Sequence, residues 1–160
     1  MTTKEYLNST NEEECKQFNK ELCEKYPWLI PTNRWTGEIV EDYDYGYTEL
    51  DQMPEGWRIA FGDQMVGELN QEFVKGGFVN DYRITQIKEK YGGLRWYDNG
   101  NTKEGYNIIN KYESLSRKTC ICCGKPAKYI TLGWISPFCE DCIKDINDRY
   151  ETVEEYFGEE

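Results

Sequence analysis

The sequence contains no histidine. This absence excludes Ser-His-Asp and Cys-His nucleophilic mechanisms, histidine-ligated nuclease metal sites and HExxH proteases. The chain also lacks any apolar run as long as a membrane span, and its first residues lack the pattern of a secretory signal. From these absences we expect a non-catalytic protein that works in a cytoplasm and has no membrane partner.

Negative charge dominates the composition. Among the 160 residues, 30 acids outnumber 19 bases, which gives a net charge of −11. Such a chain is repelled by nucleic acids at long range, so direct DNA binding is not expected. It is attracted instead to basic surfaces, including the nucleic-acid grooves of other proteins. Five tryptophans, thirteen tyrosines and six phenylalanines still supply the apolar surface of a globular core.

Three segments have the apolar spacing of amphipathic helices, at residues 11–25, 55–75 and 103–118. Thr10 followed by Glu13 is a capping-box signal at the start of the first. The second carries apolar residues at every fourth position and is expected to bury them. They are Trp57, Phe61, Met65, Leu69 and Phe73.

Residues 82–98 have the composition of a β-hairpin, with β-branched and aromatic residues on both sides of a Gly92-Gly93 turn. The hairpin gathers basic charge in an otherwise acidic chain. One interpretation is a surface that captures an anionic nucleotide by ion pairing and by stacking its base. The other is an ordinary sheet with solvating charges at its edge. The residues concerned are Lys88, Lys90, Arg95 and Trp96.

A run of tyrosines and acids, EIVEDYDYGYTELD, occupies residues 38–51. Tyr43, Tyr45 and Tyr47 alternate with other residues, and a period of two would place their rings on one side of an extended segment. Such a face could pack on the core or form an acidic, aromatic recognition surface. The acids of this run have no spacing that indicates a metal-dependent nuclease.

The strongest motif is a pair of CxxC sequences, Cys120/Cys123 followed by Gly124, and Cys139/Cys142. Seven cysteines in a chain without a secretion signal indicate thiols that bind metal rather than form disulfides. Two CxxC turns can point four sulfurs at one centre. We therefore predict one structural Zn²⁺ in a closed four-thiolate site. Cys122 falls outside the x-x spacing and is predicted to be a spare thiol.

Between the CxxC pairs, AKYIT and GWIS have the composition of a short hairpin, and a helix is expected after Cys139 with Ile143, Ile146 and Tyr150 on one face. Knuckle, hairpin and helix together are typical of a treble-clef-like zinc finger. The predicted fold class is therefore α+β: three helices with a small antiparallel sheet, plus this C-terminal finger. We expect a body at residues 1–118 and a module at 119–160, packed as one unit.

Several segments in combination resemble a widespread set of small proteins of phages, prophages and other mobile elements. The resemblance covers roughly residues 54–142 and rests on Gly56-Trp57, IKEKYGGLRWY at 87–97, and the TCxxCGKPA and GWxxPFCxxC segments. Members of this set often end the second ligand pair with histidine, where this chain has Cys142. The resemblance implies a phage-like accessory protein with the zinc ligands named above, and it implies no catalytic residues.

These observations lead to three functional expectations. The first is a non-catalytic protein that binds and inhibits a basic host protein through its acidic surface, such as a CRISPR-type or other host-defence nuclease, in the cytoplasm of the host cell. The second is a sponge that captures an anionic nucleotide immune signal on the basic hairpin. The third is a structural or assembly role in the phage.

Overall fold

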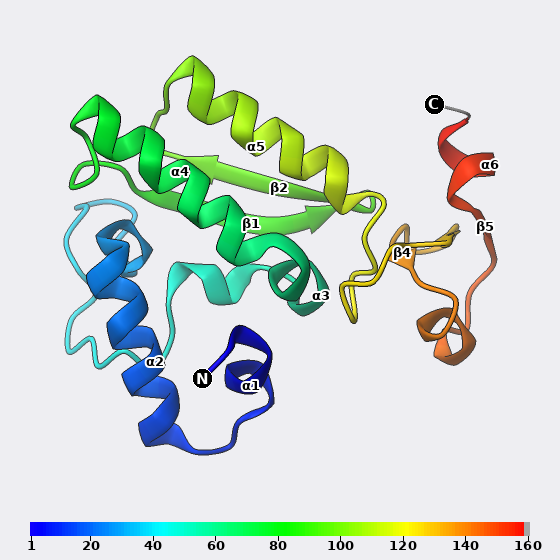
Figure 1. The fold of residues 1–160 in the computed structure, drawn as a ribbon, viewed down its shortest axis with the longest axis horizontal. Helices are drawn as coiled ribbons and strands as arrows, with labels where there is room; N and C mark the ends of the chain where they lie inside the picture. Colours follow the sequence, from blue (N-terminus) through cyan, green and yellow to red (C-terminus); the bar gives the residue numbers. More distant parts are fainter. Residues whose placement is uncertain (159–160) are drawn as a thin grey trace.

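A small antiparallel sheet with helices packed on one face forms the body of the protein (Figure 1). In this computed structural model, which describes residues 1–158, β1 (Ile84–Lys90) pairs with β2 (Gly93–Asp98). Helices α4 (Asp63–Gly76) and α5 (Lys103–Ser116) pack against each other and over this pair. The mixed helix-and-sheet class is thus as predicted. Among the described residues, no helix has the length and apolar character needed to cross a membrane.

The described part of the chain has five α-helices rather than three, when α3 (Glu55–Trp57) and α4 are counted as one continuous helix. The two unpredicted helices are α1 (Thr3–Asn8) and α6 (Val153–Phe157). Each is too short to show a helical period in the sequence. The first predicted helix is present as α2 (Glu12–Lys25).

The caps and short turns complete the helical elements. The side chain of Asn11, not that of Thr10 as predicted, caps α2 by accepting from the Glu14 backbone N–H. Asparagine is one of the preferred capping residues because its side-chain oxygen satisfies an orphan donor. The short 3₁₀ helices are η1 (Pro27–Leu29), η2 (Glu49–Gln52) and η4 (Cys142–Asp145).

A π-helical segment, η3 (Arg58–Gly62), joins α3 to α4. The five apolar residues predicted to share one face, spaced four apart from Trp57 to Phe73, are all buried. In a straight α-helix, residues four apart are offset by about 40° around the axis. The wider π turn takes up part of that offset, so that both ends of the stripe face the same core.

Aromatic side chains fill the centre of the body. The buried Trp28 ring packs edge-on against Phe73 and Tyr82, with ring centroids 5.2 and 5.3 Å away. The Tyr82 hydroxyl accepts from the Trp96 indole N–H and donates to Asp98, both at 2.8 Å. A buried Tyr and Trp thus satisfy each other's polar atoms, which lets both rings enter the core.

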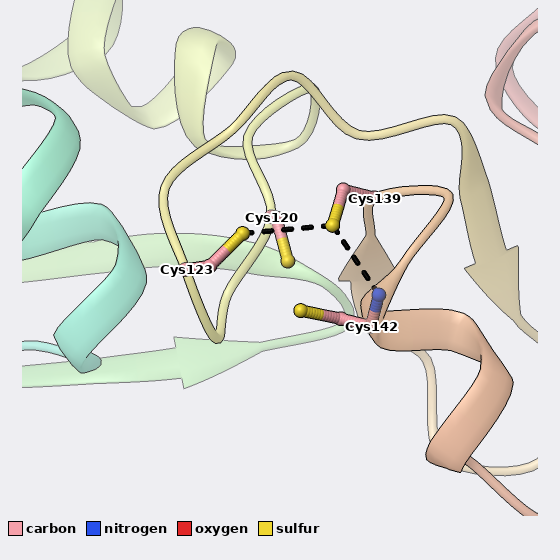
Figure 2. Close-up of side chains that lie close together, drawn as sticks. All are labelled: Cys120, Cys123, Cys139 and Cys142. Carbon is pink, nitrogen blue, oxygen red and sulfur yellow. Dashed lines mark hydrogen bonds between the residues drawn. The ribbon is translucent and has the colours of Figure 1, made fainter.

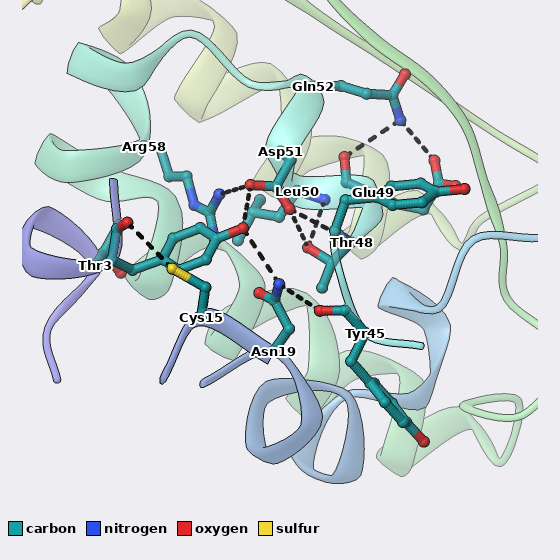
Figure 3. Close-up of polar contacts among 12 residues, drawn as sticks. Thr3, Cys15, Asn19, Tyr45, Thr48, Glu49, Leu50, Asp51, Gln52 and Arg58 are labelled. Atoms are coloured by element: carbon teal, nitrogen blue, oxygen red, sulfur yellow. Dashed lines mark hydrogen bonds and ion pairs between the residues drawn. The ribbon is translucent and has the colours of Figure 1, made fainter. Parts of the chain in front are cut away.

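A polar network joins the N-terminal helices to the start of the long helix (Figure 3). The Asp51 carboxylate accepts from Arg58 and from the Tyr6 hydroxyl, both at 2.8 Å. Asn19 of α2 donates to the Tyr6 hydroxyl and to the Tyr45 carbonyl, at 3.2 and 2.8 Å. Arg58 is only 1% exposed, so its charge depends on Asp51 for compensation. The network therefore fixes α1, α2 and η2 against η3.

The β1–β2 hairpin turns at Tyr91-Gly92, one residue earlier than the predicted Gly92-Gly93, because Lys90 pairs with Gly93. Tyr91 and Gly92 both have positive φ, 53° and 80°. A two-residue turn with this pair of left-handed residues matches the twist of the strands. Tyrosine is an uncommon residue in that conformation.

The C-terminal module contains a three-stranded sheet in the order β4 (Pro137–Phe138), β3 (Tyr129–Thr131), β5 (Tyr150–Thr152). The helix predicted after Cys139 is wrong: only η4 forms there, and the chain then extends into β5. The i, i+3 spacing of Ile143 and Ile146 is met by a 3₁₀ turn as well as by an α-helix. Strand pairing with β3 then holds the chain extended.

The module contacts the body backbone to backbone. The Gly56 N–H donates to the Ile121 carbonyl, and the Trp57 indole donates to the Thr119 carbonyl, both at 2.9 Å. A Cβ atom at Gly56 would lie 2.3 Å from the Cys120 carbonyl oxygen. Gly124 also lies close to the body, because a Cβ atom there would be 2.6 Å from the Gly56 carbonyl oxygen. These contacts leave no room for side chains at either position.

We expect Gly56→Ala to separate the metal-binding knuckle from the body and to lower the free energy of unfolding by about 1–3 kcal/mol. The matched control is Gly67→Ala in the same long helix, where the new methyl group would meet only the Tyr26 hydroxyl at 3.8 Å. That control should gain up to about 1 kcal/mol from helix propensity. Urea unfolding measures both, and equal stability of the two variants would contradict the close docking.

Candidate functional site

Four cysteine sulfurs converge in the C-terminal module (Figure 2). The Sγ atoms of Cys120, Cys123, Cys139 and Cys142 all lie within 4.8 Å of one another. The Cys123 and Cys139 sulfurs are 3.5 Å apart, far beyond the roughly 2.05 Å of a disulfide. Four ligands at about 2.3 Å around a tetrahedral ion would place the sulfurs about 3.8 Å apart. The cluster therefore fits a tetrahedral metal ion without rearrangement of the backbone, as the sequence predicts.

The first pair of sulfurs is presented by a tight turn. The Cys120 N–H donates to the Lys125 carbonyl at 2.7 Å, and the Gly124 N–H donates to the Cys120 carbonyl at 3.0 Å. Gly124 has φ +85°, a conformation that glycine adopts without steric cost. Glycine is thus required at position 124 for two reasons: the positive φ and the close contact with the Gly56 backbone.

The second pair follows β4 and opens η4. The Cys142 N–H points at the Cys139 sulfur at 3.4 Å, and the Ile143 N–H donates to the Cys139 carbonyl at 3.1 Å. Ile121 of the first knuckle donates its N–H to the Pro137 carbonyl at 3.0 Å. This last bond holds the two knuckles together, so the convergence of the sulfurs is set by the backbone.

The electrostatics of the cluster favour a cation. Burial raises the pKa of the Cys123 and Cys142 thiols. Burial also opposes ionisation of Cys139, but the backbone N–H of Cys142 and the neighbouring Cys123 and Cys142 thiols outweigh it and lower the pKa of Cys139 to about 7. Metal binding replaces the remaining thiol protons, and its affinity therefore rises with pH.

The shell around the sulfurs is mostly apolar. Cys120 and Cys139 are buried with Phe138 and Ile143, and the other two ligands are half-buried. The four thiols form a complete tetrahedral set with no position for water, which is typical of a structural site. Cys122 is exposed and outside the cluster, as the spacing predicts.

No protein-family model matches this chain, and comparison with curated proteins and with solved structures finds no match.

The structure separates the residues of the predicted nucleotide surface. Lys88 and Arg95 lie directly opposite each other across the hairpin, and Lys90 is exposed beside its turn. Trp96 points the other way, into the core, where it is 5% exposed and bonded to Tyr82. It therefore offers no ring for stacking. Alternation along β2 exposes Tyr97 instead.

Tyr43, Tyr45 and Tyr47 lie in a loop rather than in the extended segment that a period of two would require. Asp42 and Tyr45 have positive φ, 56° and 65°. The rings of Tyr45 and Tyr47 nevertheless both contact Tyr43, with centroids 4.9 and 5.9 Å away. The Tyr43 hydroxyl donates to the Tyr47 carbonyl and lies 3.8 Å from the Cys23 sulfur. The rings gather because the loop curls around Tyr43.

Sequence reasoning missed two exposed tryptophans, Trp35 and Trp134, which are 92% and 76% exposed. Each lies in a turn: Trp35 follows Asn33 and precedes Gly37, and Trp134 follows Gly133. The turn-forming residues beside each tryptophan could have predicted that its indole is exposed, because turns lie at the surface.

We expect Cys139→Ser to lose the bound metal, because a four-thiolate site reduced to three ligands binds far more weakly. Cys122→Ser is the matched control and should keep one metal ion per chain. Native mass spectrometry of gently purified protein measures the metal directly. Metal retained by Cys139→Ser, or lost from Cys122→Ser, would contradict the assignment of the four ligands.

Proposed function

We propose that this chain is a non-catalytic, zinc-stabilised accessory protein of phage type that binds and inhibits a basic host protein through its acidic N-terminal surface. The metal in this proposal is one structural Zn²⁺ per chain. Four thiolates without histidine or carboxylate are a ligand set that zinc accepts, and a closed set leaves no site for a reacting water. A module of this size cannot bury enough apolar surface to be stable alone, and the ion supplies the missing stability.

The observation that carries the proposal is the presentation of Trp35. Asn33 accepts the backbone N–H groups of Trp35 and Thr36 at 2.8 and 3.1 Å. It also donates its own N–H to the Glu38 carbonyl and accepts from Gly37, at 2.7 and 2.8 Å. The turn is thus fixed by four hydrogen bonds while the indole at its tip stays uncovered. Tryptophan in such a position is typical of an interface anchor.

Acidic residues occur in the same N-terminal part of the chain as this anchor, and the Glu38 carbonyl closes its turn by accepting from the Asn33 N–H. Lys16 bridges Glu12 of α2 and Asp44 of the tyrosine loop, at 3.1 Å each, so that the loop and the helix form one surface. The acidic residues of this surface, here called the acidic face, are exposed. They are Glu12, Glu13, Glu38, Glu41, Asp42 and Asp44. An exposed aromatic anchor together with such an acidic surface suits a partner with a basic groove.

A nucleic-acid-binding host-defence protein, such as a CRISPR-type nuclease, has a groove of this kind. Carboxylates placed in the groove would occupy the sites of phosphates, and the long-range field of a −11 chain would speed the encounter. Inhibition then requires no chemistry by this chain, only exclusion of the nucleic acid. We place this action in the cytoplasm of the host cell, where such nucleases work.

Binding of the zinc-loaded protein to a panel of purified basic host-defence nucleases tests the proposal. We expect binding that weakens steeply with salt and competes with the nuclease's own nucleic acid. Trp35→Ala should weaken it by at least about 30-fold, the size of a hot-spot substitution.

Trp134→Ala is the matched control, because this exposed indole belongs to the C-terminal module rather than to the acidic face, and its loss should leave nuclease binding unchanged. The proposal would fail if no basic nuclease bound in a salt-sensitive way. It would also fail if Trp35→Ala and Trp134→Ala had the same effect.

A further inference from the structure

The outer face of the β1–β2 hairpin is the reverse of the acidic face in charge. Leu94 and Trp96 point inward beneath α4 and α5, so the alternate residues of the hairpin point outward. These outward residues are all at least partly exposed, and we call the surface they form the basic face. They are Gln86, Lys88, Lys90, Arg95 and Tyr97.

Positive charge is concentrated here, and it is compensated only in part, by the interaction of Glu113 with Arg95 and Arg117. Residues 82–118 hold eight of the nineteen bases and four of the thirty acids. Lys88 and Arg95 are direct cross-strand neighbours, a like-charge pair that destabilises a sheet. A Cβ atom at Gly93 would meet Arg117 and Arg95 at 3.1 and 3.2 Å, which places a second guanidinium beside the first.

A cleft of about 320 Å³ continues the basic face beyond the first residue of β1. Arg34 and Arg83 line it together with the side chains of Asn33, Asn99 and Tyr47. Of the described residues that line the cleft, Glu49 alone is acidic. A second recess, lined by Lys88 and Tyr97, shares Arg34 and Thr85 with the cleft, so the two are continuous.

An aromatic shelf lies at the opposite end of the hairpin. Tyr91 and Trp134 are 70% and 76% exposed and line one recess with Lys90 and Ile135. Asp148 accepts the N–H groups of Gly133 and Trp134, at 3.1 and 2.9 Å, and so fixes the turn that carries the indole. Tyr91 is held at positive φ, a conformation that costs energy for a tyrosine and occurs preferentially at functional sites.

We propose that this surface, from the arginine cleft across the basic face to the aromatic shelf, binds a short single-stranded oligonucleotide. Basic side chains in a row would hold the phosphates, and the exposed rings of Tyr97, Tyr91 and Trp134 would stack on bases. The proposal does not rest on the acidic face, although the arginine cleft includes Asn33 and Arg34 of the turn that carries Trp35.

The dimensions and charge of the surface select the ligand. The seven residues of β1 span about 20 Å. This length exceeds that of a mononucleotide, so the two ends of the surface would contact different nucleotides of one strand. The rest of the chain is strongly acidic and repels long polyanions. Open rings accept the faces of unpaired bases, which a duplex does not offer. A short unpaired strand meets all three conditions.

Fluorescence anisotropy with labelled six-nucleotide oligothymidylate and oligouridylate, using zinc-loaded protein at low salt, tests the proposal. We expect Tyr97→Ala and Trp134→Ala each to weaken binding about 5- to 100-fold, the range for loss of one stacking ring. Lys88→Gln should reduce the slope of log affinity against log salt by about one.

Each variant has a control matched in exposure or charge. Tyr106→Ala on α5 removes a tyrosine that is 45% exposed, against 42% for Tyr97. Tyr106→Ala serves for Trp134→Ala as well, Lys20→Gln matches Lys88→Gln in charge, and both controls should bind like the wild type. Absence of binding by the wild type would overturn the proposal. So would full competition by hexaglutamate with no effect of the ring variants, since that outcome indicates an unselective cationic surface.

Discussion

The contact of Gly56 with the backbone of Cys120 and Ile121 is the constraint on which the arrangement of the whole chain depends. It places the first metal-binding knuckle against the start of the long helix, where Trp57 is wholly buried and bonds to Thr119. The next residue, Arg58, pairs with Asp51, and this pair holds the N-terminal helices against the long helix. One turn of helix therefore connects the metal cluster, the aromatic core and the N-terminal segments.

Acidic and basic side chains are concentrated on different elements of this framework. Acids gather on α2 and the tyrosine loop, and bases gather on the outer side of the hairpin. The basic face survives in a chain of net charge −11 because strand alternation turns its residues away from the helices. The chain thus carries two surfaces of opposite sign, and it also exposes two tryptophans, one in an N-terminal loop and one in the C-terminal module.

The features fixed by local chemistry could be predicted from the sequence. The four ligands follow from two CxxC turns, and the buried stripe from Trp57 to Phe73 follows from its spacing. The composition also predicts the hairpin, but it predicts the turn one residue too late. Tyr91, rather than a second glycine, takes the first left-handed position. The inward direction of Trp96 then follows from the register, which composition does not specify.

Features that depend on tertiary pairing could not be predicted. The segment after Cys142 has apolar residues spaced for a helix, yet part of it forms β5, which pairs with β3 as the third strand of the sheet. The arginine cleft joins Arg34 from a loop to Arg83 beside β1, and the two are far apart in the sequence. The π turn at Arg58–Gly62 has no propensity of its own and exists because both ends of the stripe must be buried.

The five tryptophans fall into two optical classes. Trp28, Trp57 and Trp96 lie in the apolar core, whereas Trp35 of an N-terminal loop and Trp134 of the C-terminal module are exposed to water. Indoles in these environments differ in emission wavelength and in access to a soluble quencher. Blue-shifted, protected emission thus reports on the integrity of the core, and red-shifted, quenchable emission reports on the two surfaces. The protein carries intrinsic probes for folding and for surface occupancy that can be read in one spectrum without a label.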